Sequence, residues 1–199
     1  MSGETPVLVE SGFSRKAEPQ KAKHYFIADA HFGHSNIHMK FRKEFYSQEE
    51  HNETIHQNIL NTGNKCDCLW LLGDIFFKES ELWRLSAYAK KFQHVYYVLG
   101  NHDISSAWRY AAQHKNVSIH GIESRWGLWI SHAPIHECEL YRGMNIHGHT
   151  HDKKVGFTDR DYFNTVYTEE DLNYFCVSCE QVDYKPISLD EIKQIRGWR

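Results

Sequence analysis

Five short apolar segments of this chain each run directly into polar residues with carboxylate, carboxamide or imidazole side chains. Segments of this length, rich in aromatic and β-branched residues and bounded by turn residues, are typical of buried strands. The polar residues are Asp29 and His31 after 25–28, Asp74 after 69–72, Asn101, His102 and Asp103 after 95–99, His132 after 127–131, and His149 and His151 after 144–147.

Helical patterns separate several of these segments, and together they predict a layered α/β domain. Residues 47–61 open with a serine and, three positions later, a glutamate, which is the spacing of a capping box, and residues 188–198 open in the same way. Because strands and helices alternate in the first half and strands predominate in the second, we expect a largely antiparallel second sheet. Ligands in such folds bind beyond the carboxyl ends of the strands.

Length and composition are those of an ordinary globular protein. The 199 residues suit one domain, which we expect to cover 23–199 after a flexible tail at 1–22. No apolar run approaches the length of a membrane-spanning helix, and the N-terminal residues lack the pattern of a secretory signal peptide. The five cysteines form no evident disulfide framework, so we expect a reducing, cytoplasmic location without a membrane partner.

Charge limits the class of partner. The formal net charge is −3 and no stretch is strongly basic, so stable binding of long nucleic acids is not favoured. The negative net charge is still compatible with small anionic substrates, because bound cations supply positive charge that a count of residues omits. The chain also contains 15 histidines, which form either a histidine-rich surface or a set of metal ligands.

Convergence of the five segment ends on one sheet edge favours the metal ligands. Each polar residue alone has an ordinary explanation, such as a helix cap, a turn or a surface histidine. Two aspartates, one asparagine and at least four histidines together would repel one another, or lack partners, unless cations lay among them. These ligand types suit Mn, which we favour, or Fe, Zn, Ni or Co. Their number suits two divalent ions that share one carboxylate, roughly 3.5–4 Å apart.

The order of the motifs, Asp-x-His, Gly-Asp, Gly-Asn-His-Asp, an isolated His and Gly-His-x-His, resembles that of the calcineurin-like metallophosphoesterases. The stretches "DAHFGHSNI", "SHAPIH", "NIHGHTH" and "YKPISLDEI" are most similar to a small single-domain branch of bacteria and their phages. The resemblance implies a four-layer α-β-β-α sandwich of two mixed sheets. It also implies that a phage-encoded copy would act in the host cytoplasm.

The resemblance further implies a role for each matching residue. Asp74 would bridge both metals, His102 would assist catalysis beside the second metal, and Asp103 would orient the His102 ring. Phe77 stands where many relatives have another acid, which weakens the likeness to the protein-phosphatase branch. The remaining ligands would be Asp29, His31 and His151 for the first metal, and Asn101, His132 and His149 for the second.

The implied activity is hydrolysis of a phosphoester bond by a metal-bridging hydroxide. We favour a phosphodiester of small, nucleotide-like character, contacted by His34, Arg42 and Arg142, although a solvated surface charge is the alternative for each arginine. A phosphomonoesterase or protein phosphatase of the same superfamily stays open, and so does a metal-stabilised scaffold without turnover. Nucleotide binding without hydrolysis lacks support, because neither a Walker loop nor a Gly-x-Gly-x-x-Gly pattern occurs. The sequence does not indicate the oligomeric state.

Overall fold

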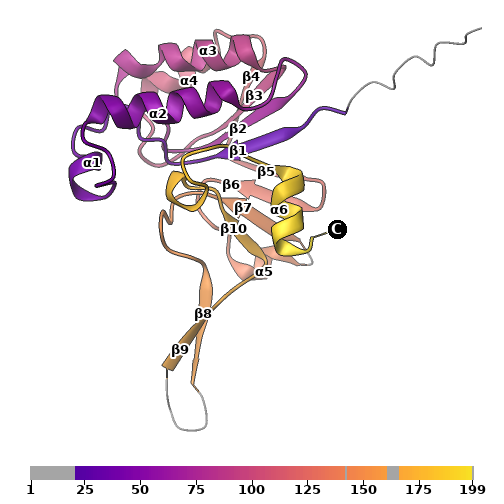
Figure 1. The fold of residues 1–199 in the computed structure, drawn as a ribbon. Coiled ribbons are helices and arrows are strands. Elements are labelled where there is room, and N and C mark those ends of the chain that lie inside the picture. The colour runs from indigo at the N-terminus through magenta and orange to yellow at the C-terminus, as the bar shows by residue number, and fades with distance from the viewer. Residues whose placement is uncertain (1–20, 142, 161–165, 199) are drawn as a thin grey trace, which may run out of the picture.

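The computed structural model of the protein describes residues 21–141, 143–160 and 166–198 (Figure 1). The predicted tail at 1–22 therefore lies almost entirely outside the described residues, and Arg142 lies outside them as well. None of the helices within those ranges combines the length and the apolar content that crossing a membrane requires.

The first sheet has five strands in the order β11-β1-β2-β3-β4. Strands β1 to β4 are parallel to one another, and β11 pairs antiparallel with β1. Because the parallel strands run in one direction, their carboxyl ends lie at the same edge of the sheet. The strands are β1 (His24–Ile27), β2 (Cys68–Leu72), β3 (His94–Val98), β4 (Val117–His120) and β11 (Ile187–Ser188).

The second sheet has four strands in the order β10-β7-β6-β5. Strand β7 is parallel to both β6 and β10, and only the β5–β6 pair is antiparallel. The expectation of a largely antiparallel second sheet is therefore wrong, because the long segments after β6 and β7 supply the crossovers that parallel pairing needs. The strands are β5 (Ile122–Arg125), β6 (Leu128–Ser131), β7 (Met144–His147) and β10 (Tyr174–Cys176).

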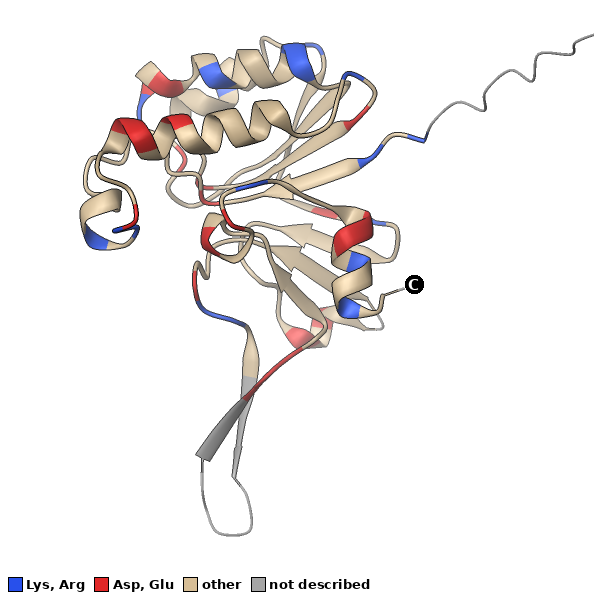
Figure 2. Cartoon of the chain, in the orientation of Figure 1, with Lys and Arg blue, Asp and Glu red and all other residues tan. Residues whose placement is uncertain are grey.

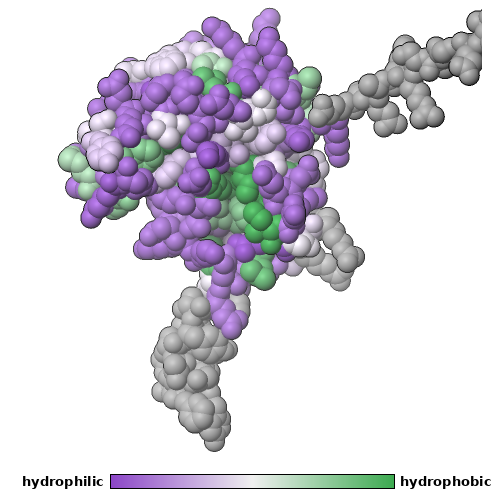
Figure 3. All heavy atoms as spheres, viewed as in Figure 1, coloured by the Kyte–Doolittle hydropathy of each residue, from purple (hydrophilic) through white to green (hydrophobic). Residues whose placement is uncertain are grey.

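Three helices cover the outer face of the first sheet in Figure 1: α2 (Gln48–Asn61), α3 (Trp83–Lys91) and α4 (Ser105–Ala111). Along β2, Leu69 and Leu71 pack with the residues of these helices, whereas Trp70 and Leu72 pack between the two sheets. Both faces of β2 are thus buried, which explains why its sequence is continuously apolar rather than alternating. The face drawn in Figure 3 is mostly hydrophilic, with an apolar strip beside α6 (Leu189–Arg196) and a smaller apolar area at the left, over the first helical segment.

The helix α6 packs against β1 and β11 and places Ile192 in the apolar cluster between the sheets. It begins with the complete capping box predicted at Ser188 and Glu191. Two mixed sheets with flanking helices confirm the predicted α/β sandwich. The remaining elements are α1 (Ile37–Lys40), α5 (Glu137–Leu140), two 3-10 turns (Glu79–Glu81 and Cys179–Gln181) and the hairpin of β8 (Gly156–Arg160) and β9 (Val166–Glu170), which projects from the sheets in Figure 1.

Candidate metal centre

The predicted ligands lie just beyond the strand ends, in loops with an unusual backbone. Outside glycine, a left-handed φ is uncommon, and it concentrates at functional sites. Asp29 and His31 do not continue the extended strand, because β1 ends at Ile27 and both residues turn left-handed. Five of the seven predicted ligands have such a φ: Asp29 (57°), His31 (51°), Asp74 (54°), His149 (70°) and His151 (52°).

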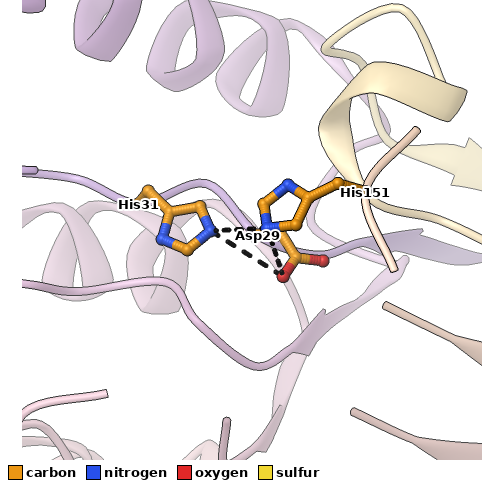
Figure 4. A group of neighbouring side chains, drawn as sticks. All are labelled: Asp29, His31 and His151. Carbon is orange, nitrogen blue, oxygen red and sulfur yellow. Dashed lines mark hydrogen bonds and ion pairs between the residues drawn. The ribbon is translucent and has the colours of Figure 1, made fainter. Parts of the chain in front are cut away.

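The first cluster consists of Asp29, His31 and His151 (Figure 4). The Nε2 atoms of the two histidines lie 3.3 Å apart, and each lies 3.9 Å from Oδ1 of Asp29. Three potential ligand atoms thus converge on one point, although they come from segments 120 residues apart in the sequence.

The surroundings of Asp29 and His31 leave their ligand atoms available to a cation. Asp29 is fully buried, and its Oδ2 accepts hydrogen bonds from Ser178 Oγ (2.7 Å) and the His149 backbone N–H (2.9 Å). Its Oδ1 has no hydrogen-bond partner among the described residues. Burial, together with the charge of Arg42, lowers the pKa of His31 to about 2, so its imidazole is neutral and able to ligate a metal.

The second cluster consists of Asp74, His132 and His149. The Nδ1–H of His132 donates to the Leu72 carbonyl oxygen (2.8 Å), so in the neutral ring the lone pair lies on Nε2. That nitrogen lies 3.5 Å from Oδ2 of Asp74 and 2.9 Å from Oδ1 of Asn101. Burial lowers the pKa of His132, but the hydrogen bond and charge of Asp74 outweigh it and raise the pKa, so this point favours positive charge.

Both clusters fit divalent cations. Each brings together carboxylate oxygen and imidazole nitrogen, which suit transition metals, and in each the three possible ligand atoms lie within 4.8 Å of one another. The Asp29 Oδ1, a buried carboxylate oxygen without a hydrogen-bond partner among the described residues, is an unfavourable arrangement that a cation would relieve. The structure thus brings together six predicted ligands in two groups and places Asn101 beside the second. The bridging role of Asp74 stays a prediction.

Glycines allow the loops of the two clusters to approach one another. A Cβ on Gly100 would lie 2.2 Å from both the backbone nitrogen and Oδ1 of Asp74. A Cβ on Gly148 would lie 2.4 Å from the Ala28 Cβ and 2.6 Å from Oδ2 of Asp29. The glycines of the motifs are therefore required by close contact between the ligand loops.

Asp103 does not hold the His102 ring. Its carboxylate accepts four backbone N–H bonds of 2.8–3.0 Å, from Asp74, Ile75, Phe76 and Gly100. The predicted orienting role is therefore corrected: Asp103 fastens the loop after β2 to the loop after β3, because both present free amides at this point. It supports the position of Asp74 rather than that of His102.

Arg42 also has a different position from the one predicted. Its side chain is 0% exposed, and its guanidinium donates to the Asp29 carbonyl oxygen (2.6 Å) and to Glu180 (2.8 Å) and lies 2.7 Å from His51 Nε2. A group enclosed in this way does not reach a substrate, so the predicted phosphate contact is wrong. Arg42 instead supports the loop that carries the first cluster.

Glu180 is a functional residue that the sequence analysis missed. Its Oε1 accepts hydrogen bonds from His151 Nδ1 (3.0 Å) and Arg42 Nε (2.8 Å), which leaves the lone pair of His151 on Nε2, facing Asp29. Burial raises the pKa of Glu180, but hydrogen bonds to His151 and Arg42 and the Arg42 charge overcome it and hold the pKa at about 2. No spacing in the sequence links Glu180 to partners 29 and 138 residues away.

We expect Glu180→Gln to weaken binding of the first cation by about 10- to 100-fold, the usual range for a residue that orients a ligating histidine. The amide keeps the shape of the side chain but withdraws the negative charge that fixes the His151 tautomer. Titration of the metal-free protein with Mn²⁺, followed by calorimetry, measures the change. Glu79→Gln, on an exposed 3-10 turn, is the control, and equal affinities in the two variants would contradict the assignment.

His34 and His102 lie beside the clusters. The His102 ring is exposed, and its backbone N–H donates to Oδ1 of Asp74 (2.8 Å). The His34 ring centroid lies 6.1 Å from that of His31 and 4.9 Å from that of Phe77. Burial lowers the pKa of His34. Substrate contact by His34 stays a prediction, and Arg142 lies outside the described residues.

Comparison with known proteins identifies chains of similar sequence and fold, but these have no described activity. No protein-family model matches the chain. An uncharacterized protein of Methanocaldococcus jannaschii, MJ1445, is 26% identical over 175 residues, which cover 87% of this chain and 90% of that protein. The crystal structure of AQ665, a protein of unknown function from Aquifex aeolicus, matches 87% of this chain and 99% of its own with a TM-score of 0.62 and 28% identity.

A phosphopantetheinyl hydrolase from Mycobacterium tuberculosis is more distant. It matches 56% of this chain and 42% of its own, with a TM-score of 0.37 and 17% identity. This likeness is too low to support an argument about the chain. The geometry of the two clusters is therefore the guide to function.

Proposed function

We propose that the protein is a dinuclear, metal-dependent phosphoester hydrolase of the calcineurin-like metallophosphoesterase type. The observation that carries the proposal is the pair of clusters, each with a carboxylate and two imidazoles, on adjoining loops that follow strands of both sheets. Their loops are joined directly, since the His149 backbone N–H bonds to Asp29 of the other cluster (2.9 Å). The order of the motifs along the chain supports the same family.

Two cations bound by these residues would activate water and neutralise charge on the phosphate oxygens. The role of the protein side chains would be to hold the two cations and to orient the groups around the substrate. Asp29, His31 and His151 would hold one cation, and Asn101, His132 and His149 the other, with Asp74 between them. During hydrolysis the bond from phosphorus to the leaving oxygen breaks, water oxygen joins phosphorus, and His102 gives its proton to the leaving oxygen. The attacking water releases one proton to the solvent, and His102 takes one proton back from the solvent, so the protons balance over a full turnover.

His102 is suited to this role because of where it lies. Asp74 holds its backbone N–H (2.8 Å), so the residue is fixed relative to the second cluster. Its ring is exposed and forms no hydrogen bond with any described residue, which leaves both nitrogens free for a substrate. A scaffold without turnover has no use for an imidazole in this position, so the geometry favours an enzyme.

We further propose a small, nucleotide-like phosphodiester as substrate and Mn as the first-choice metal. Asn101, His102 and His149 are exposed, so the clusters are open to a small molecule. Figure 2 shows both signs of charge on the helical layer and on α6 rather than a basic stripe, and the net charge is −3. This distribution does not favour a long nucleic acid. A phosphomonoesterase activity is the second candidate.

Metal reconstitution of the full chain tests the proposal. The stripped protein is loaded with Mn, Fe, Zn, Ni or Co, and hydrolysis of bis-p-nitrophenyl phosphate, p-nitrophenyl phosphate and a panel of cyclic and linear nucleotides is compared. We expect metal-dependent turnover, faster with the diesters. Absence of hydrolysis with every metal would overturn the enzyme assignment, and faster turnover of the monoester would favour the second candidate.

The role of His102 has its own expected result. His102→Ala should keep the metal content and lower kcat for a nucleotide diester by about 10²–10⁴-fold, the usual contribution of a general acid. His114→Ala, which removes a histidine just beyond α4, serves as the control. Unchanged turnover in His102→Ala would show that the assigned role is wrong.

A further inference from the structure

The His102 ring lacks the support that a proton donor usually has. Imidazoles that act as general acids are commonly oriented by a hydrogen bond from one ring nitrogen to a carboxylate or carbonyl. The nearest acid in the sequence, Asp103, is fully engaged by four backbone amides. No other described residue forms a hydrogen bond with the ring, so its orientation must have another cause.

The His102 ring centroid lies 6.4 Å from that of His31, and its nearer aromatic neighbour is Phe77. Its ring stacks on the His102 ring with a centroid distance of 5.6 Å and an interplanar angle of 27°. Other neighbours hold Phe77 itself: its ring lies 4.8 Å from that of His31 and 4.9 Å from that of His34. Its backbone N–H donates to the Phe32 carbonyl oxygen (2.8 Å). The phenyl ring therefore joins a ligand of the first cluster to the exposed imidazole of His102.

We propose that Phe77 is the positioning residue for His102, holding its imidazole by ring stacking so that both nitrogens stay free to protonate the leaving oxygen. The inference rests on the proposed function. Stacking restricts the tilt of a ring without using its nitrogens, whereas an acid at this position would compete for one of them. Phe77 stands where many members of the resembled family have an acid, and here it would position the His102 ring.

The proposal predicts a dependence on the leaving group. A p-nitrophenolate leaves readily without a proton, but the alkoxide of a ribose or simple alcohol does not, so only the second substrate needs a well-placed His102. We expect Phe77→Leu to lower kcat for an alkyl or nucleotide diester by about tenfold or more. Hydrolysis of bis-p-nitrophenyl phosphate should fall less than about threefold. Phe77→Tyr, which keeps the ring, should restore the alkyl activity.

A double-variant cycle separates positioning from general damage. If Phe77 acts only through His102, then Phe77→Leu combined with His102→Ala should be no slower than His102→Ala alone. Metal content and the unfolding midpoint should match those of wild type, and Phe41→Leu, at an exposed phenylalanine, should behave as wild type. If Phe77→Leu misfolds, Phe77→Tyr and Phe77→Trp are compared with wild type instead. Both keep an aromatic ring, so the ratio of kcat for the alkyl diester to kcat for bis-p-nitrophenyl phosphate should equal that of wild type.

Four results would overturn the inference. Equal loss on both substrates would mean that Phe77 only shapes the site, and a further loss in the double variant would mean that it acts independently of His102. If His102→Ala is slow but Phe77→Leu is not, the proposed function stands and the positioning role falls. If the metal-loaded wild type hydrolyses nothing, the proposed function fails, and this inference fails with it.

Discussion

Asp74→Asn is expected to abolish binding of at least one cation and to lower kcat/KM for phosphodiesters by more than about 100-fold, beyond the range for residues that merely support a ligand. Burial raises the pKa of Asp74, but the hydrogen bond and charge of His132 and the His102 backbone N–H bring the pKa below its usual value. The side chain is therefore a carboxylate at neutral pH, and the amide removes its charge from the centre.

The same substitution should leave the fold intact, which makes the result interpretable. An asparagine oxygen still accepts the His102 N–H that Oδ1 of Asp74 accepts (2.8 Å). Its amide can donate to the His132 nitrogen, which lies 3.5 Å from Oδ2. Elemental analysis of metal content, steady-state kinetics and urea unfolding give the three readouts. Asp190→Asn, in the exposed first turn of α6, is the control, and a variant with full metal content and activity would refute the site.

Gly100→Ala is expected to damage both stability and the second cluster. The added methyl group would lie 2.2 Å from the backbone nitrogen and Oδ1 of Asp74, so one of the two loops must move. Overpacking of this kind typically costs about 1–3 kcal/mol. Because Asp103 binds the amides of both Gly100 and Asp74 (2.9 Å each), the displacement would reach the metal ligand directly.

Gly121→Ala is the matched control for Gly100→Ala. A Cβ at Gly121 meets no atom within 4 Å, so the same chemical change should leave the free energy of unfolding within about 0.5 kcal/mol of wild type. Chemical denaturation of both variants, with and without Mn²⁺, measures the difference. Equal stability and equal metal binding in the two alanine variants would contradict the close approach of the loops.

The strands were predictable where the physical constraint is local. The runs at 69–72 and 95–99 are apolar because β2 is buried on both faces and β3 is buried at Val95, Tyr97 and Val98, and the structure confirms strands there. Strand β5 was missed, since Ile122-Glu-Ser-Arg lies at a sheet edge, is partly exposed, and has no apolar pattern. The parallel pairing of β7 and β10 was missed because it depends on a crossover, not on strand composition.

The ligands of the two clusters were predictable by type and order, but their supports were not. Asp29 and His151 belong to motifs of a few residues, whereas Arg42 and Glu180 meet across 138 residues. The family resemblance implied that Asp103 would orient the His102 ring. The structure instead satisfies four backbone amides with its carboxylate, and nothing in the sequence shows where free amides will lie.

The left-handed backbone at five ligand positions limits how this centre could be moved to another protein. A designer who copied Asp29, His31, Asp74, His149 and His151 onto regular strand ends would obtain the right side chains with the wrong directions. Each of these residues has a left-handed φ, which differs from the extended φ of a strand and is unfavourable for L-amino acids. A transplant would have to carry the loops, their glycines and the Asp103 carboxylate that fastens them. The directions of the ligands thus depend on a set of backbone turns, and the ligand side chains alone do not define the centre.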